Sequence, residues 1–276
     1  LCGVSDPAVV LEASALCDEL GIDTISAGAT VAFAMECAER GLIAAPGGLR
    51  FGSGAALLET LRDIGSRRGL GDLLSQGTRE AASAIGKGAE EFAPHVKGLE
   101  IPGYEPRALQ TMALGFAVNP RGADHNRSGA YQVDFSDSVD RMHLVPDDVH
   151  RAIEVENESA VMDSLILCKF LRGVFEDRLS EMAEMLRLVV GWDVTAGELA
   201  ETGARIVAAR KWYNISQGWS PAADTLPKRF LSEALPDGAS RGAALSPARL
   251  QGLVEAYNVA RGWLPDGSIP AEIAAE

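Results

Sequence analysis

Residues 6–26 read DPAVVLEASALCDELGIDTIS, and this stretch decides how the chain begins to fold. Asp6 followed by Pro7 favours a helix start, because aspartate caps free N–H groups and proline is tolerated at the first helical position. Apolar residues then recur at three- and four-residue spacing until Gly21 ends the pattern. The sequence therefore predicts a helix before Gly21, and a second, rich in small residues, over Ser26–Arg40.

Helical periodicity continues along most of the chain, and strand patterns are scarce. Further helices are expected at Leu57–Arg67, Leu73–Ile85, Val149–Val174, Leu179–Val190, Ala196–Gln217 and Pro247–Arg261. Residues 94–135 fit neither period for long, apart from an apolar stretch at 109–118, and such long irregular segments are often functional. The weak strand candidates are Val96–Ile101 and a few residues near Val133. The predicted class is mainly α.

Composition excludes several classes of protein. The chain has 276 residues, 47% of them hydrophobic, and a formal net charge of −14. This is a globular composition, and it holds no apolar run of the roughly 18 residues needed to span a membrane. Because so negative a charge repels a phosphate backbone, we expect no nucleic-acid partner.

The cysteines indicate the cellular compartment, and the first residues indicate the extent of the chain. Cysteines occur at positions 2, 17, 37 and 168, in neither a C-x-x-C pair nor a dense disulfide framework. We therefore expect a reducing, cytoplasmic location. The chain opens at Leu1 without an initiator methionine or a signal segment, so we expect a piece of a longer protein.

Two carboxylates flank the glycine at the first helix end. Asp18 precedes Gly21 and Asp23 follows it. Such a pair can accept hydrogen bonds from the ring N–H groups of a heterocycle such as a pterin or guanine. In the alternative interpretation, Asp23 only caps the next helix and Asp18 is solvated.

A second segment has a related spacing. Asp163 is followed five residues later by Cys168, with Ile166 where the first motif has glycine. Cys168 could equally be a small buried hydrophobe in an apolar helix. The pairing of two such segments suggests that they hold two similar halves of one ligand.

His125 is the strongest candidate for proton transfer. It lies in the irregular segment, in the run Arg121-Gly-Ala-Asp-His125-Asn-Arg127, and its ordinary pKa near ~6.5 suits general acid–base chemistry. The alternative is a loop histidine hydrogen-bonded to Asp124 or to the backbone. No nucleophile elbow, phosphate-binding glycine loop, HExxH or zinc-type cysteine cluster occurs in the sequence. This absence disfavours the hydrolases and nucleotide enzymes that depend on those motifs.

Taken in order along the chain, these residues resemble the tungsten- or molybdenum-dependent aldehyde:ferredoxin oxidoreductase family. The matching stretches are residues 16–26, residues 95–100 with Pro102, residues 121–125, residues 163–170, residues 224–230, and Tyr257 with residues 261–263. The resemblance therefore extends over essentially the whole chain.

The resemblance implies specific cofactor contacts. Asp18, Gly21, Ile22 and Asp23 would contact one of two pterin dithiolene cofactors, and Asp163 and Leu167 would contact the other. Cys168 matches the fourth ligand of a [4Fe–4S] cluster, and His125 matches a histidine near the metal that assists proton transfer. The tungsten or molybdenum would be held by dithiolene sulfurs.

The chain also departs from the family pattern. The N-terminal sheet domain, the Cys-x-x-Cys-x-x-x-Cys run with three cluster ligands and an upstream catalytic glutamate are missing. The expected domains are residues 1–97, a truncated helical domain 2 with the first pterin motif, and residues 98–276, helical domain 3 with the second motif and the cluster cysteine. We expect this segment alone neither to hold a stable cluster nor to oxidise aldehyde.

For the parent enzyme, the resemblance implies oxidation of a small aldehyde to a carboxylic acid, with electrons passing through the cluster to ferredoxin or a similar carrier. One alternative is the same cofactor acting on another substrate, such as an activated aromatic ring. A second is a cofactor-free helical interaction module. The small-residue surface of Ser26–Arg40 could pack internally or against a second subunit in a homodimer.

Overall fold

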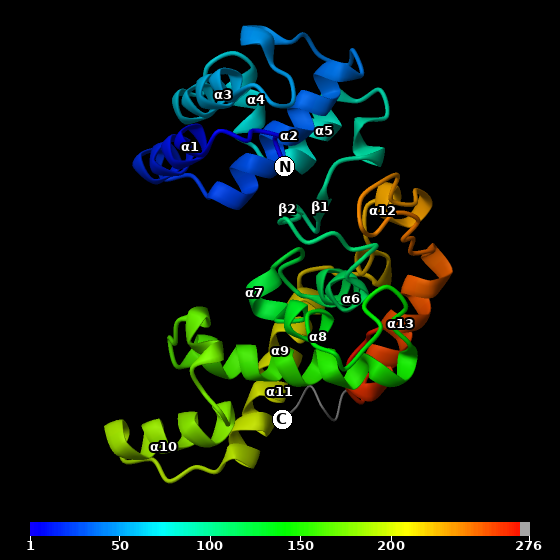
Figure 1. The fold of residues 1–276 in the computed structure, drawn as a ribbon. Coiled ribbons are helices and arrows are strands. Elements are labelled where there is room, and N and C mark those ends of the chain that lie inside the picture. Colours follow the sequence, from blue (N-terminus) through cyan, green and yellow to red (C-terminus); the bar gives the residue numbers. More distant parts are fainter. Residues whose placement is uncertain (271–276) are drawn as a thin grey trace. The chain divides into compact units, whose positions relative to one another are not determined.

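The computed structural model describes residues 1–270 and is built mainly of helices, as Figure 1 shows. The α-helices are α1 (Pro7–Leu20), α2 (Thr24–Glu39), α3 (Gly54–Ser66), α4 (Leu70–Leu74), α5 (Thr78–Ile85), α6 (Gln110–Val118), α7 (His125–Ser128), α8 (Tyr131–Asp134), α9 (Val149–Ser164), α10 (Arg178–Val190), α11 (Ala196–Ser216), α12 (Lys228–Ser232) and α13 (Pro247–Ala260). The 3-10 helices are η1 (Pro46–Gly48), η2 (Ala89–Glu91), η3 (Pro146–Asp148), η4 (Lys169–Gly173) and η5 (Pro221–Ala223).

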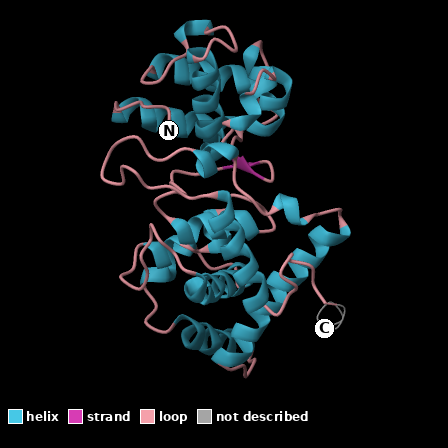
Figure 2. Ribbon diagram, turned by 90° about the vertical axis from the view of Figure 1, so that its right-hand side faces the viewer, coloured by secondary structure: helices cyan, strands magenta, loops and turns pink. Residues whose placement is uncertain are grey.

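Strands are short, as the magenta arrows of Figure 2 show. Strands β1 (His95–Val96) and β2 (Leu99–Glu100) pair antiparallel, with His95 opposite Glu100. The hairpin overlaps the predicted strand region Val96–Ile101 and begins one residue before it. The prediction of a mainly α chain is confirmed. No helix within residues 1–270 combines the length and the apolar character needed to cross a membrane.

The chain forms two compact units. Unit 1 comprises Leu1–Tyr104, Arg121–Ala123 and Leu226–Glu233, and unit 2 comprises Glu105–Pro120, Asp124–Thr225 and the chain from Ala234. The family-domain boundary expected after residue 97 stays a prediction, because a compact unit and a family domain are different divisions of a chain.

Helix α2 lies at the centre of the core of unit 1. Its small side chains, including Ala27, Ala29 and Ala34, are buried, and Phe33 packs against Phe92 with ring centroids 5.5 Å apart. Small residues allow the neighbouring backbone to approach closely. The small-residue surface therefore packs inside the unit, while the predicted homodimer stays a prediction.

In unit 2, α9, whose last turn carries Asp163, packs against α11. Gly203 of α11 makes the approach possible: a Cβ atom there would lie 2.5 Å from the carbonyl oxygen of Asn157. A glycine at this point lets the two backbones meet directly.

Some expected element boundaries were wrong. The predicted helix Leu73–Ile85 is divided by Gly77, whose φ of 84° breaks helical geometry, while the Glu100 carboxylate accepts a 2.7 Å hydrogen bond from the first N–H of α5. The irregular segment contains α6, α7 and α8, and Val133 is helical rather than extended. The predicted helix Val149–Val174 ends at Ser164.

The close approach at Gly203 leads to a prediction. Replacement of Gly203 by Ala should lower the free energy of unfolding by about 1–3 kcal/mol, because the methyl group overlaps the α9 backbone. Gly197→Ala, in the first turn of the same helix, is the matched control, since a Cβ there meets only Thr195 Oγ1 at 3.8 Å. Urea titration measures both. Equal stability of the two variants would contradict this packing.

Candidate functional site

The first candidate turn joins α1 to α2 in unit 1. Gly21 has φ 67°, and its N–H donates to the carbonyl of Asp18 at 3.2 Å. The N–H of Ile22 donates to the carbonyl of Cys17 at 2.8 Å. These two bonds satisfy carbonyls at the end of α1 and leave the side chains of Asp18 and Asp23 exposed on either side of the turn.

Asp23 also has a structural task. Its Oδ2 atom accepts a 2.8 Å hydrogen bond from the N–H of Ser26 and so caps α2. Asp23 therefore has the capping role that is one interpretation of its sequence position, and the cap holds its carboxylate in place beside the turn. Ile22 is half-buried and packs against the core of unit 1, which anchors the turn.

The second candidate turn ends α9 in unit 2 and repeats the same hydrogen bonds. The N–H of Ile166 donates to the carbonyl of Asp163 at 3.1 Å, and the N–H of Leu167 donates to the carbonyl of Met162 at 2.9 Å. Ile166 has φ 58°. A β-branched residue rarely adopts this conformation, so a position that glycine fills in the first turn is strained in the second.

One oxygen of the Asp163 carboxylate has a close cationic partner, and the other has no hydrogen-bond donor within residues 1–270. Its Oδ1 atom lies 2.8 Å from the Lys169 ammonium. Its Oδ2 atom is buried, and no donor within the described residues hydrogen-bonds it; Arg210 lies 3.9 Å away. A buried acceptor without a donor is costly, so this oxygen fits the N–H of a bound heterocycle.

Cys168 lies just after the second turn and directly before η4. Its thiol is free and exposed, and it stands beyond the end of α9 rather than inside an apolar helix. The neighbouring side chains Ile166 and Phe170 are also exposed. Within residues 1–270 no group of three or more His, Cys, Asp or Glu side chains is arranged to hold a metal ion. A reachable thiol is the donor that an iron–sulfur cluster uses, and Cys168 fits one such ligand.

His125 opens α7 and is half-buried. The Asp124 Oδ1 atom before it accepts the N–H groups of Asn126 at 2.9 Å and Arg127 at 3.0 Å. This cap fixes the short turn that carries the imidazole. The ring lies 6.2 Å, centroid to centroid, from that of Tyr131.

A buried carboxylate supports the same region from α8. Asp134 accepts the N–H groups of Thr111 at 3.1 Å and Met112 at 2.8 Å, at the start of α6. Burial raises the pKa of Asp134 to about 6, against the lowering effect of these hydrogen bonds.

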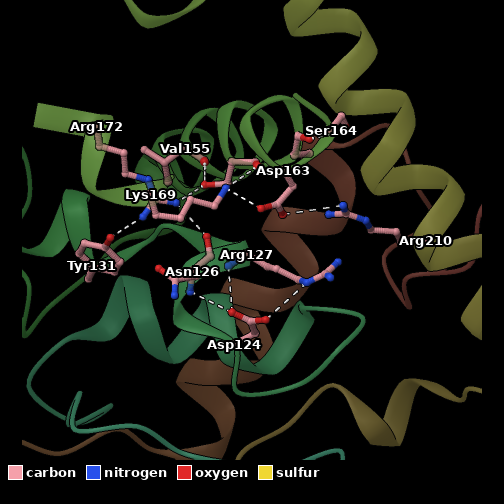
Figure 3. A network of polar contacts seen from close by, with 12 residues as sticks. Asp124, Asn126, Arg127, Tyr131, Val155, Asp163, Ser164, Lys169, Arg172 and Arg210 are labelled. Carbon is pink, nitrogen blue, oxygen red and sulfur yellow. Dashed lines mark hydrogen bonds and ion pairs between the residues drawn. The ribbon is translucent and has the colours of Figure 1, made fainter. Parts of the chain in front are cut away.

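The structure brings the predicted site residues together in two groups. Asp18, Gly21, Ile22 and Asp23 share the turn in unit 1, and Asp163, Leu167 and Cys168 share the turn in unit 2. His125 belongs to unit 2, where basic side chains connect its turn to α9 (Figure 3). Three of these basic residues, Lys169, Arg172 and Arg210, were not expected from the sequence. Only the position of Lys169 next to Cys168 could have drawn attention to one of them.

Comparisons with known proteins identify the family to which the chain belongs. The family model for aldehyde ferredoxin oxidoreductase, domains 2 and 3, matches residues 1–276. The chain belongs to this family. The predicted family membership is thereby confirmed.

Individual relatives agree with the family match. The tungsten-containing aldehyde ferredoxin oxidoreductase of Pyrococcus furiosus is 36% identical over 281 residues, which cover 98% of this chain and 45% of that protein. The enzyme of the same description from Thermococcus kodakarensis is 35% identical, with 99% and 46% covered. The chain therefore spans about half the length of these curated relatives.

Two more distant proteins share the fold or part of the sequence. The aliphatic sulfonate oxidoreductase, WOR-like subunit, of Pyrococcus furiosus is 28% identical, over 99% of this chain and 43% of that protein. The active site complex BamBC of benzoyl coenzyme A reductase superimposes with a TM-score of 0.72 at 19% identity, over 98% of this chain and 46% of that chain. The second likeness shows a common fold.

The cost of the left-handed conformation in each turn can be tested by substituting Ile166 and Gly21. Ile166→Gly should raise the free energy of unfolding by about 1 kcal/mol, because glycine adopts this conformation without steric cost and Ile166 is 92% exposed. Gly21→Ile should lower it by about 1–2 kcal/mol; no atom lies within 4 Å of a Cβ there, so only the backbone conformation opposes the change. Urea titration measures both. A less stable Ile166→Gly protein would contradict the strain.

The pKa of Asp134 predicts a pH dependence. Below its ordinary pKa of 3.8 the carboxyl is protonated in both folded and unfolded chains. Between about pH 4 and 6 the unfolded chain releases this proton first, so the free energy of unfolding falls by about 3 kcal/mol as pH rises. Unfolding titrations across this range, with Asp134→Asn as control, isolate the effect. An identical pH slope in the variant would contradict it.

Proposed function

We propose that this chain carries one binding turn for each of two pterins of a tungsten- or molybdenum-dependent oxidoreductase. The whole enzyme would oxidise aldehydes to carboxylic acids and pass the electrons through a [4Fe–4S] cluster to ferredoxin. The observation that carries the proposal is the repeated turn: Asp18 and Asp163 occupy the same place in two helix ends with the same pair of backbone hydrogen bonds.

The residues present fit a heterocyclic ligand. The buried Oδ2 atom of Asp163 lacks a donor within the described residues, and a ring N–H would supply one. Asp18 and Asp23 present carboxylates on either side of the first turn. Ile22 and Leu167 follow the left-handed residue in each case, where their side chains pack on the core of their own unit.

When bound, the metal and its pterins would supply the two-electron oxidation of the aldehyde with water. The chain would bind and orient them through Asp18, Gly21, Ile22, Asp23, Asp163 and Leu167. His125, held at the start of α7 by the Asp124 cap, would accept or donate the proton at its imidazole. The Cys168 thiolate would be one of the cluster ligands.

The relatives favour an aldehyde as substrate over other compounds. Identity to the tungsten-containing aldehyde enzymes is 36% and 35%, against 28% to the sulfonate oxidoreductase subunit. The benzoyl coenzyme A reductase complex shares the fold at 19% identity, which supports no assignment of its substrate to this chain. A cytoplasmic location stays a prediction.

Metal, pterin and substrate can be tested on the full protein that contains this chain, produced with tungstate or molybdate. We expect bound tungsten or molybdenum, bound pterin and iron, and aldehyde-dependent reduction of ferredoxin. Protein free of metal and pterin would contradict the cofactor assignment and support a helical interaction module. Turnover of a sulfonate or an aromatic thioester in place of aldehydes would contradict the substrate.

The role of Cys168 is tested in the same protein. Cys168→Ala should lose bound iron and reduce ferredoxin at least about tenfold more slowly, because one cluster ligand is removed. Cys37→Ala is the matched control, since Cys37 is a buried free thiol in unit 1. Iron analysis and ferredoxin reduction measure the difference. Full iron content and unchanged ferredoxin reduction in Cys168→Ala would contradict the ligand assignment.

A further inference from the structure

Two basic side chains of η4 turn back onto the site residues of unit 2, as Figure 3 shows. Lys169 donates to the carbonyl of Ser159 at 2.7 Å and pairs with the Oδ1 atom of Asp163 at 2.8 Å. Arg172 donates to the Ser159 hydroxyl and to the Asn126 carbonyl, both at 2.8 Å, and to the hydroxyl of Tyr131. Both therefore converge on Ser159, which is buried in α9.

We infer that Lys169 and Arg172 are positioning residues for the cofactor site. Lys169 holds Asp163 by Oδ1, so that Oδ2 stays directed to a ligand N–H. Arg172 holds the carbonyl of Asn126, the residue after His125, and so fixes the turn that carries the imidazole. This inference rests on the proposed function, because it assigns these side chains to the support of the same pterin and the same proton-transfer residue.

The geometry at Asp163 distinguishes Lys169 from its basic neighbour. Lys169 makes a hydrogen bond to Oδ1, whereas Arg210 lies 3.9 Å from Oδ2, beyond hydrogen-bond distance. One oxygen is thus occupied by a short contact and the other is faced by a charge alone. A ligand N–H that bonds Oδ2 would leave the Lys169 contact intact.

Burial distinguishes both residues from ordinary surface ion pairs. The Lys169 side chain is 15% exposed, and burial lowers the pKa of its ammonium although Asp163 opposes this. Arg172 is 9% exposed and contacts three separate segments of the chain. The Arg187–Glu184 pair of α10, by contrast, has both side chains about half exposed, and such pairs contribute little. Cations this deep in the protein hold their acceptors in fixed geometry.

The two contacts also connect the candidate residues to one another. Cys168 directly precedes η4, Lys169 reaches Asp163, and Arg172 reaches the His125 turn. All of these residues lie in unit 2. A shift of η4 would therefore move the Cys168 thiol, the Asp163 carboxylate and the His125 imidazole together. Residues that hydrogen-bond to a ligand-binding side chain commonly set its orientation in this way.

Lys169 is tested by pterin content in the full protein. Lys169→Met keeps the aliphatic stem and removes the ammonium, and it should reduce bound pterin per chain about tenfold. Lys169→Arg, which restores a cation and its donors, should recover most of it. Lys228→Met removes an exposed cation paired with Glu91 and is the matched control. Thermal unfolding shows which variants fold.

Arg172 is tested by kinetics on loaded enzyme. Arg172→Met should lower kcat about tenfold and change its pH profile, while KM for the aldehyde and pterin content stay near the parent values. Arg172→Lys should recover part of kcat, and Arg187→Met should change nothing.

The outcomes separate this inference from the proposed function. Parent protein without pterin or aldehyde turnover would overturn both. Loaded, active parent protein together with normal pterin in Lys169→Met and a normal pH profile in Arg172→Met would overturn the inference alone. If Lys169→Met fails to fold, failure of Lys169→Arg to restore pterin in a folded protein would equally overturn it.

Discussion

An α-helix that stops leaves the carbonyls of its last turn without partners, and the candidate site depends on how α1 and α9 meet this constraint. Each helix places one residue in the left-handed conformation, Gly21 or Ile166, which turns two successive N–H groups back to the helix end. The carboxylate of Asp18 or Asp163 then lies beside the turn. The termination of a helix thus creates the turn that we propose as a binding feature.

The two turns share a backbone conformation but have different chemical surroundings. In unit 1 the turn is exposed, and Asp23 serves both as a flanking carboxylate and as the cap of α2. In unit 2 the turn contains a strained isoleucine whose side chain is 92% exposed, so packing within the unit offers no reason for it. Such strain persists only where the surroundings enforce it. Lys169 and Arg172 of η4 supply that enforcement through their contacts with Asp163 and Ser159 of α9.

Much of the helical fold follows from periodicity, and so does the first turn, because Gly21 and Asp23 are local signals that need no distant partner. The end of α9 was misjudged because Ile166 is a poor predictor of a left-handed conformation. The division of Leu73–Ile85 depends on Glu100, more than twenty residues away along the chain. The contact of Arg172 with the His125 turn also depends on a distant partner, because Asn126 lies 46 positions away in the sequence. Spacing patterns carry no information on such pairs, so this contact could not be predicted.

A local cluster of basic side chains in unit 2 contrasts with the acidity of the chain as a whole. The net charge is −14, yet Arg127, Lys169, Arg172 and Arg210 gather around Asp124 and Asp163 (Figure 3). Burial lowers the pKa of Arg210, and the charge of Arg127 adds to this effect. Bringing these cations together costs free energy, which their hydrogen bonds to backbone and carboxylate offset. The Asp163 carboxylate is thus paired with neighbouring cations, whereas the Asp18 carboxylate is exposed, so two similar ligand groups would meet the same backbone geometry with unequal restraint.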